Sequence, residues 1–181
     1  MGIPTLLHTT NVTSSTAQTA ITSGIDSTYD EYMFVVTDLH QSGGGAGFWI
    51  QASTDSGSSY DTVATTTAFN AKHTEAGTGT LQYETGHDRA QSGTGVHLLW
   101  GIGNDNDMSA AGIIHLFNPS STTYVKHFYA TFSEMGYDDS ANNFFAAGYF
   151  NTTSAIDAVQ FDIESGTSTI DNVTIQMYGI S

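Results

Sequence analysis

Apolar and polar side chains alternate in two runs near the C-terminus, and this pattern constrains the fold more than any other feature. The runs cover residues 158–164 and 172–180, and a Ser-Gly-Thr-Ser break at 165–168 separates them. A period of two residues is typical of a β-strand with one face in a core and the other toward water. We therefore expect an antiparallel strand pair at the closing edge of a β-sandwich. The side chains expected to face the core in the first run are Val159, Phe161 and Ile163, and those expected to face water are Gln160, Asp162 and Glu164.

Similar short runs follow one another along the rest of the chain. Breaks rich in Gly, Ser, Asn and Asp separate them, and these residues favour turns. No segment has the long apolar period of 3.6 residues that predicts a helix. Closely spaced strands are typical of an all-β sandwich or barrel. The predicted strands lie near residues 17–23, 31–39, 46–54, 61–68, 94–101, 110–117, 123–133, 144–151, 157–164 and 172–180.

Two of these strands are apolar on both sides. The strand at 32–39 places Tyr32, Phe34 and Val36 on one side and Met33, Val35 and Leu39 on the other. The strand at 110–117 has the same character. Strands that read as apolar on both sides are usually covered on both faces, so we expect both to be central strands.

The length of 181 residues suits one domain, and 39% apolar residues suffice for a core. We assign residues 16–181 to a single antiparallel β-sandwich domain and residues 1–15 to an N-terminal arm. The arm is polar apart from its large apolar residues Ile3, Leu6 and Leu7. It is either a loosely held end or a segment that lies on a neighbouring subunit.

Residues 70–94 lack a clear period and are expected to form a long excursion from the sandwich. Long loops on a rigid sandwich are where binding usually resides. This excursion, together with the apolar residues of the arm, is our first candidate for an interaction surface. The candidate residues are Ile3, Leu6, Leu7, Lys72, His73, Tyr83, His87 and Arg89.

The chain is strongly acidic, with a formal net charge of −15 and only three basic residues, Lys72, Arg89 and Lys126. Binding to a phosphate backbone needs clustered Lys and Arg, so nucleic acid and anionic membranes are excluded as partners. The N-terminus has no apolar run long enough for a signal or membrane-spanning segment. Cysteine is absent, which excludes disulfides, thiolate zinc sites and a thiol nucleophile.

Signatures of catalysis are missing from the sequence. There is no Gly-x-Ser-x-Gly nucleophile motif, and no glycine-rich loop leads into Gly-Lys-Ser/Thr. A pair of carboxylates for glycoside cleavage stays open, because 18 acids bring two within range in almost any fold. We predict a protein that is not an enzyme and binds no cofactor.

The sequence shows no metal-binding pattern and leaves sugar binding open. The seven histidines lack metal-binding spacings, and His97, His115 and His127 fall inside apolar strands, where core or interface roles are favoured. The acidic run 104–107 is read as a turn rather than a calcium loop, so no metal is predicted. Exposed aromatic rings beside carboxylates would favour sugar binding, and the sequence leaves that open for Trp49, Trp100, Tyr60, Tyr83, Tyr124 and Tyr137.

Three segments together carry a resemblance to a known class of proteins. They are the ending from Ala158 to Ile180, the stretch TSGIDSTYDEYMFVVTDLH at 22–40, and FWIQASTDSGSSYD at 48–61. The chain resembles small jelly-roll structural proteins of tailed, often marine, bacteriophages. The resemblance implies a jelly-roll β-sandwich located in the virion, which forms a homo-oligomer, with a trimer expected.

The same resemblance leaves two roles open. The first is a capsid decoration or cement protein whose partners are copies of itself and the major capsid protein or another virion protein. The alternative is a carbohydrate-binding receptor head on the phage tail.

Overall fold

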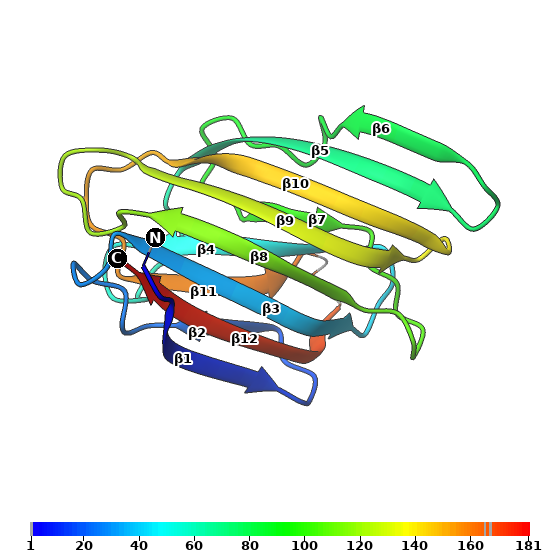
Figure 1. The fold of residues 1–181 in the computed structure, drawn as a ribbon, viewed down its shortest axis with the longest axis horizontal. Helices are drawn as coiled ribbons and strands as arrows, with labels where there is room; N and C mark the ends of the chain where they lie inside the picture. The colour runs from blue at the N-terminus through cyan, green and yellow to red at the C-terminus, as the bar shows by residue number, and fades with distance from the viewer. Residues whose placement is uncertain (1, 165, 167) are drawn as a thin grey trace.

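The computed structural model describes residues 2–164, 166 and 168–181, which form two antiparallel β-sheets packed face to face (Figure 1). No helix occurs among these residues. In spatial order, the eight strands of the larger sheet are β1 (Thr5–Val12), β12 (Ile170–Ile180), β3 (Glu31–Gln41), β8 (Ala110–Phe117), β9 (Lys126–Gly136), β10 (Ser140–Phe150), β5 (Ala64–Thr74) and β6 (Gly79–Tyr83). The smaller sheet contains β2 (Gln18–Ile21), β11 (Ala158–Ile163), β4 (Gly47–Ser53) and β7 (Val96–Trp100).

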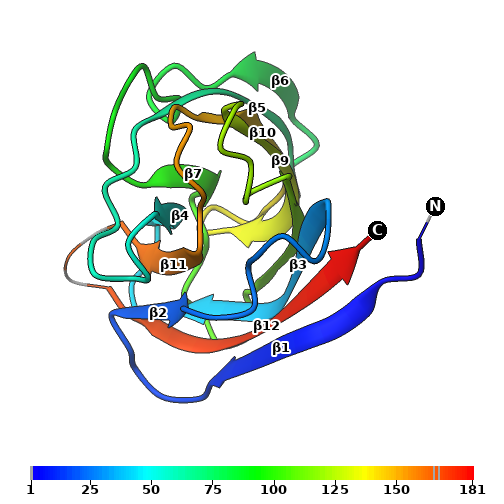
Figure 2. The same cartoon turned by 90° about the vertical axis from the view of Figure 1, so that its left-hand side faces the viewer.

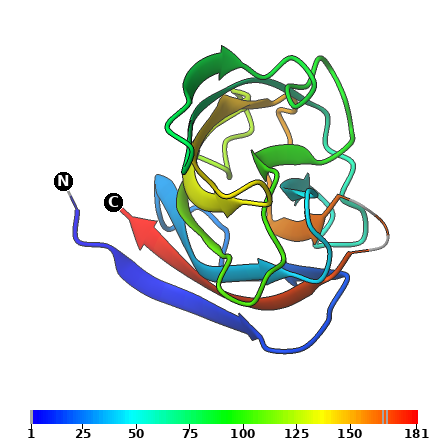
Figure 3. The same ribbon diagram turned by 90° about the vertical axis from the view of Figure 1, so that its right-hand side faces the viewer.

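The strand order is that of a jelly roll with two inserted hairpins. Strands β1-β12-β3-β8 face strands β2-β11-β4-β7. The chain crosses between the sheets at every connection except the three within the larger sheet, β5–β6, β8–β9 and β9–β10. The hairpins β5–β6 and β9–β10 extend the larger sheet beyond this frame. Figures 2 and 3 show that sheet curving around the smaller one. The predicted all-β, jelly-roll-like sandwich is therefore confirmed.

The core lies between the sheets and is rich in phenylalanine. The ring of Phe48 stacks on that of Phe161 at 5.7 Å, and Phe34 and Phe132 contact this pair edge-on at 5.8 and 6.2 Å. Such pairs add stabilisation beyond the area they bury. Lys126 is also fully buried, and its ammonium donates hydrogen bonds to the carbonyl oxygens of Tyr124 and Thr152.

Strand β3 follows the predicted alternation only as far as a β-bulge. Tyr32, Phe34 and Val36 are fully buried. The register then shifts between Val36 and Leu39, where Asp38 has a φ of 54°, so that Leu39 turns into the core. The prediction that Leu39 shares a face with Met33 and Val35 is therefore wrong. Central positions for β3 and β8 are confirmed, although their second faces are only half-buried within one chain.

The strand pair predicted at the C-terminus is wrong. Strand β11 pairs with β2 and β4, whereas β12 pairs with β1 and β3 in the other sheet. A jelly roll places these consecutive strands in opposite sheets, so the break between them is a crossing and not a hairpin turn. Ser165 and Thr167 of that predicted break lie outside the described residues. Gln160, predicted to face water, is buried.

Two strands are missing from the sequence-based list. Strand β1 lies in the segment assigned to the N-terminal arm and pairs along β12. Strand β6 lies in the predicted excursion at 70–94, and β5 extends into the same segment. Every residue of β6 is exposed, so the strand has no buried face and no alternation to reveal it.

Candidate functional site

The larger sheet presents a broad face away from the smaller sheet, which we call the outer face; Figure 1 views it directly. The strand registers arrange its side chains in rows across the sheet. One row contains Leu6, Tyr178, Met33, His115 and Tyr129, from β1 to β9. The next row contains Val35, Ile113, Thr131, Phe145, Phe69 and Tyr83, from β3 to β6.

The outer face is apolar and aromatic to an unusual degree for an exposed surface. Leu81 is 73% exposed, Tyr83 53%, Tyr129 45% and Phe69 43%. The ring of Phe69 stacks on Phe145 at 4.6 Å. Single exposed apolar residues are normal, but a continuous patch of this kind marks an interaction surface.

Carboxylates are nearly absent from this face, although the chain has 18 acids. The eight strands contain only Glu31, Asp38, Glu134 and Asp171. Glu134 is buried in the interior, and the other three lie at or near strand ends. The imidazole of His115 bonds to the Glu31 carboxylate at the margin. Among the described residues, the centre of the outer face therefore carries no carboxylate, lysine or arginine side chain.

Shallow hollows mark two parts of the face. One, of about 480 Å³, is lined by aromatic side chains of β8, β9 and β10, including Phe117, Tyr129 and Tyr149. Another, of about 680 Å³, lies where β3, β8, β9 and β10 meet the loops at one end of the sheet and is bordered by Asp38, Glu75 and Asp139.

The eight residues predicted as an interaction surface do not form one site. Leu6 and Leu7 lie on β1, with Ile3 just before it, at one edge of the larger sheet. Lys72, His73 and Tyr83 lie on β5 and β6 at the opposite edge, where Lys72 is ion-paired with Asp138. His87 and Arg89 lie in the loop that follows β6 and are half-buried.

That loop packs onto the sandwich. The His87 ring lies 4.3 Å from the Trp100 ring, and the Arg89 guanidinium lies over Trp49. Nε of Arg89 also donates to the carbonyl oxygen of Gly95 at 2.8 Å. The loop thus extends the smaller sheet's layer behind β5 and β10, and the expectation that residues 70–94 form one free excursion is wrong.

Besides Lys126, the interior contains the ionisable groups of His97, which was expected to be buried, and of Glu134, which was not. Nε2 of His97 is 2.9 Å from Oε2 of Glu164, and burial lowers the pKa of His97 to about 4 against the opposing pull of that carboxylate. The Asn142 amide donates to Glu134 at 3.0 Å, yet burial raises the pKa of Glu134 to about 8.

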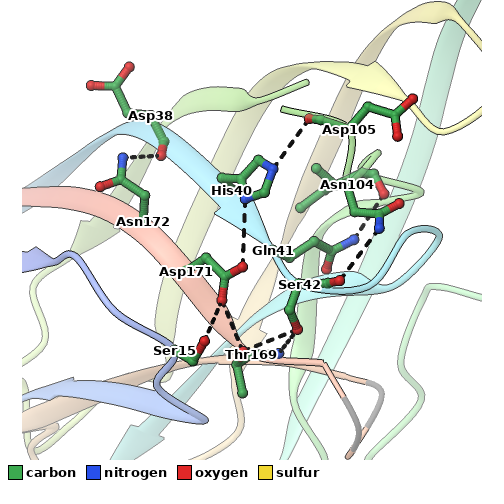
Figure 4. Close-up of polar contacts among 11 residues, drawn as sticks. Ser15, Asp38, His40, Gln41, Ser42, Asn104, Asp105, Thr169, Asp171 and Asn172 are labelled. Atoms are coloured by element: carbon green, nitrogen blue, oxygen red, sulfur yellow. Dashed lines mark hydrogen bonds and ion pairs between the residues drawn. The ribbon is translucent and has the colours of Figure 1, made fainter. Parts of the chain in front are cut away.

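A polar junction closes the end of the sandwich where β3 ends and β12 begins (Figure 4). Oδ1 of Asp171 accepts hydrogen bonds from the hydroxyls of Ser15 and Thr169, and its other oxygen lies 3.9 Å from His40. Asn104 and Asp105, from the acidic run, contribute contacts to Ser42 and His40. The acidic run 104–107 therefore takes part in the hydrogen bonds of this junction, in agreement with its interpretation as a turn. Within the described ranges, no three His, Asp or Glu side chains are grouped so that they could hold a metal ion.

The outer face escaped prediction because its apolar residues were assigned to a covered sheet face. The signal was present in the apolar character of both sides of 32–39 and 110–117. A strand that is apolar on both sides can have its second face covered either by the same chain or by another molecule, and the sequence does not distinguish the two. No helix long and apolar enough to cross a membrane is found in residues 2–164, 166 and 168–181.

Comparisons with known proteins give little further information. No protein-family model matches the chain, and no curated protein is significantly similar to it. Among solved structures, the laminarinase catalytic domain from Thermotoga maritima, solved in complex with cetyltrimethylammonium bromide, aligns with a TM-score of 0.26 and 8% identity. The alignment covers 94% of this chain and 76% of that one. This likeness is too low to carry an argument.

Proposed function

We propose that this chain is a non-enzymatic structural protein of a bacteriophage virion that binds the capsid shell as a decoration or cement protein. The observation that best supports the proposal is the outer face, an uncharged aromatic surface on a chain with a net charge of −15. Such a surface is built to be covered by protein. The resemblance of the sequence to jelly-roll phage proteins supports a location in the virion.

In this role the protein works by mechanical contact. Sheet faces would bury against sister subunits in a homo-oligomer, expected to be a trimer. Residues before β1 and the loop tips would contact the major capsid protein or another virion protein. Because many copies bind the same shell, weak individual contacts are enough for stable binding through avidity.

The test is to locate the protein on purified virions by a tag or antibody and electron microscopy. Density over the whole head in many copies is the expected result. Density confined to the tail would contradict the decoration role, and virions without the label would contradict any virion role.

A second candidate is a carbohydrate-binding receptor head on the phage tail. Two observations favour it: the hollow lined by Phe117, Tyr129 and Tyr149, and the hydrogen bond of 2.7 Å from the Tyr83 hydroxyl to Asp88. Rings beside a carboxylate suit the apolar and hydroxyl faces of a sugar. A glycan array probed with and without calcium tests this role. Binding that is lost in a Tyr129→Ala variant would support it, and a blank array would contradict it.

A further inference from the structure

We infer that the outer face binds a second copy of this chain, with the rows on β8, β9, β10, β5 and β6 at the centre of the contact. The inference rests on the proposed function in assigning the face to self-assembly. It goes further by naming the surface and its occupant.

Charge is the first argument for this occupant. Two copies that each carry −15 repel one another, and a carboxylate buried in their contact without a partner would oppose association strongly. Strands β8, β10, β5 and β6 contain no acid, Glu134 of β9 is buried, and Asp88, which accepts a hydrogen bond from the Tyr83 hydroxyl, lies in the loop after β6 at the edge of the face. Two copies can therefore meet through this face with their carboxylates held at the margins or on other surfaces.

Complementarity is the second argument. A basic partner would be attracted to the acidic parts of the molecule and would gain nothing from an uncharged patch. The outer face instead matches a surface that is itself uncharged and apolar, and another copy presents such a surface. In a two-fold symmetric dimer, the commonest oligomer of one chain, a patch meets its own counterpart in this way.

The outer face is also large enough to form a stable protein–protein interface. Eight strands about 4.8 Å apart, with three rows of outward side chains about 6.8 Å apart, cover roughly 800 Å². A standard stable interface buries about 800 Å² on each partner, so a contact over the whole face reaches that size. The exposed rings of Phe69, Tyr83 and Tyr129 are of the type that anchors such interfaces.

The β6 edge points to the same conclusion. Among the described residues, strand β6 pairs with β5 alone, all five of its residues are exposed, and none carries a charge. Proteins usually protect an exposed edge strand with charges, proline or a covering segment. Strand β6 has no charge or proline, as expected if another subunit covers it.

The experiment measures the oligomeric state of the full chain by sedimentation velocity over a concentration series. Two variants place a carboxylate on the outer face at well-exposed positions, Leu81→Glu on β6 and Tyr129→Glu on β9. Two matched controls add the same charge elsewhere. Thr80→Glu lies on the opposite side of β6, and Tyr124→Glu lies in an exposed loop. Circular dichroism and thermal unfolding establish that each variant is folded.

The wild-type chain is expected to form a dimer through this contact, and at least one outer-face variant is expected to raise the dissociation constant tenfold or more. Both controls should associate like the wild type. A wild-type chain that stays monomeric at about 100 µM would overturn the inference, as would outer-face variants that associate like the controls. Virion labelling separates the two proposals. A chain that is monomeric in solution but present on virions contradicts only this inference, and a chain that self-associates but is absent from virions contradicts only the proposed function.

Discussion

At the residue scale, Glu134 makes the stability of the fold depend on pH. Burial raises its pKa to about 8 in the folded protein, against an ordinary value of 4.5. Below the ordinary value both states hold the proton. As pH rises from 4.5 to 8, the unfolded state ionises while the folded state does not, so folding stability is progressively lost.

A Glu134→Gln variant should remove this loss because glutamine stays neutral and can still accept the Asn142 hydrogen bond. We expect the variant to gain stability over the wild type as pH rises, by on the order of 2 kcal/mol at about pH 8. Urea unfolding at about pH 5 and about pH 8 measures the difference. If the free energies of unfolding of the two proteins differed by the same amount at both pH values, the assigned pKa shift would be contradicted.

At His97, folding stability depends on pH in the opposite direction. Its pKa is about 4 in the folded protein, against an ordinary value of 6.5. The stability that depends on neutral His97 is fully present above 6.5 and is lost as pH falls from 6.5 toward 4. A His97→Gln variant should show a shallower fall of melting temperature over this range, whereas a change at the exposed His73 should not alter it. Parallel pH profiles of wild type and His97→Gln would contradict this account.

Some of these residue positions could be anticipated. His97 was expected in a core or interface position because it lies within an apolar run, and it is buried. Glu134 shares the parity of Phe128, Ala130 and Phe132 along β9, all of which are buried. The alternation along β9 therefore indicates that Glu134 faces the core. The general rule that carboxylates are exposed indicates the opposite.

At the element scale, the bulge at Asp38 determines which side chains of β3 reach the core. Its φ of 54° is left-handed, and a β-branched residue adopts that region poorly. Asp38→Val should destabilise the fold by about 1–2 kcal/mol, and Asp38→Gly should be nearly neutral. Urea unfolding of the two variants compares them directly. If valine and glycine were equally tolerated, the bulge would not be a fixed feature of the strand.

The start of the chain offers a second prediction at this scale. Ile3 is 89% exposed and precedes β1, so it stabilises nothing within its own chain. If these residues contact a neighbouring capsid protein, Ile3→Ser should lower occupancy on virions while changing the free energy of unfolding by less than about 0.5 kcal/mol. Val12→Ala, at a buried position on β1, should lower the free energy of unfolding and leave occupancy on virions unchanged. Unchanged occupancy for Ile3→Ser would remove the start of the chain from the proposed shell contact.

Strand existence was easier to predict than strand pairing. Alternation of apolar and polar residue types located β11 and β12, although only β12 alternates in burial and β11 is buried at nearly every position. Their pairing was wrong because proximity in sequence favours a hairpin, whereas a jelly roll sends the chain across to the opposite sheet. Strand β6 left no sequence signal because burial, which produces alternation, is absent there.

At the scale of the whole molecule, the two inserted hairpins create the outer face. They widen the larger sheet to eight strands while the smaller sheet keeps four, and the loop after β6 covers the inner side of the extension. The inner side is thus completed by the chain itself. The outer side is not, and its apolar rows remain available to another molecule.

Salt provides the last test, because the outer-face contact and the net charge respond to it differently. Repulsion between two copies of charge −15 is long-ranged and is screened as ionic strength rises, since the Debye length falls from about 30 Å at 0.01 M to about 10 Å at 0.1 M. The uncharged contact itself is not weakened by salt. Self-association measured by sedimentation should therefore tighten between about 0.01 M and about 0.5 M NaCl. Weaker association at high salt would mean that ion pairs of Lys72 or Arg89 hold the subunits together, and the interface would then lie outside the centre of the outer face.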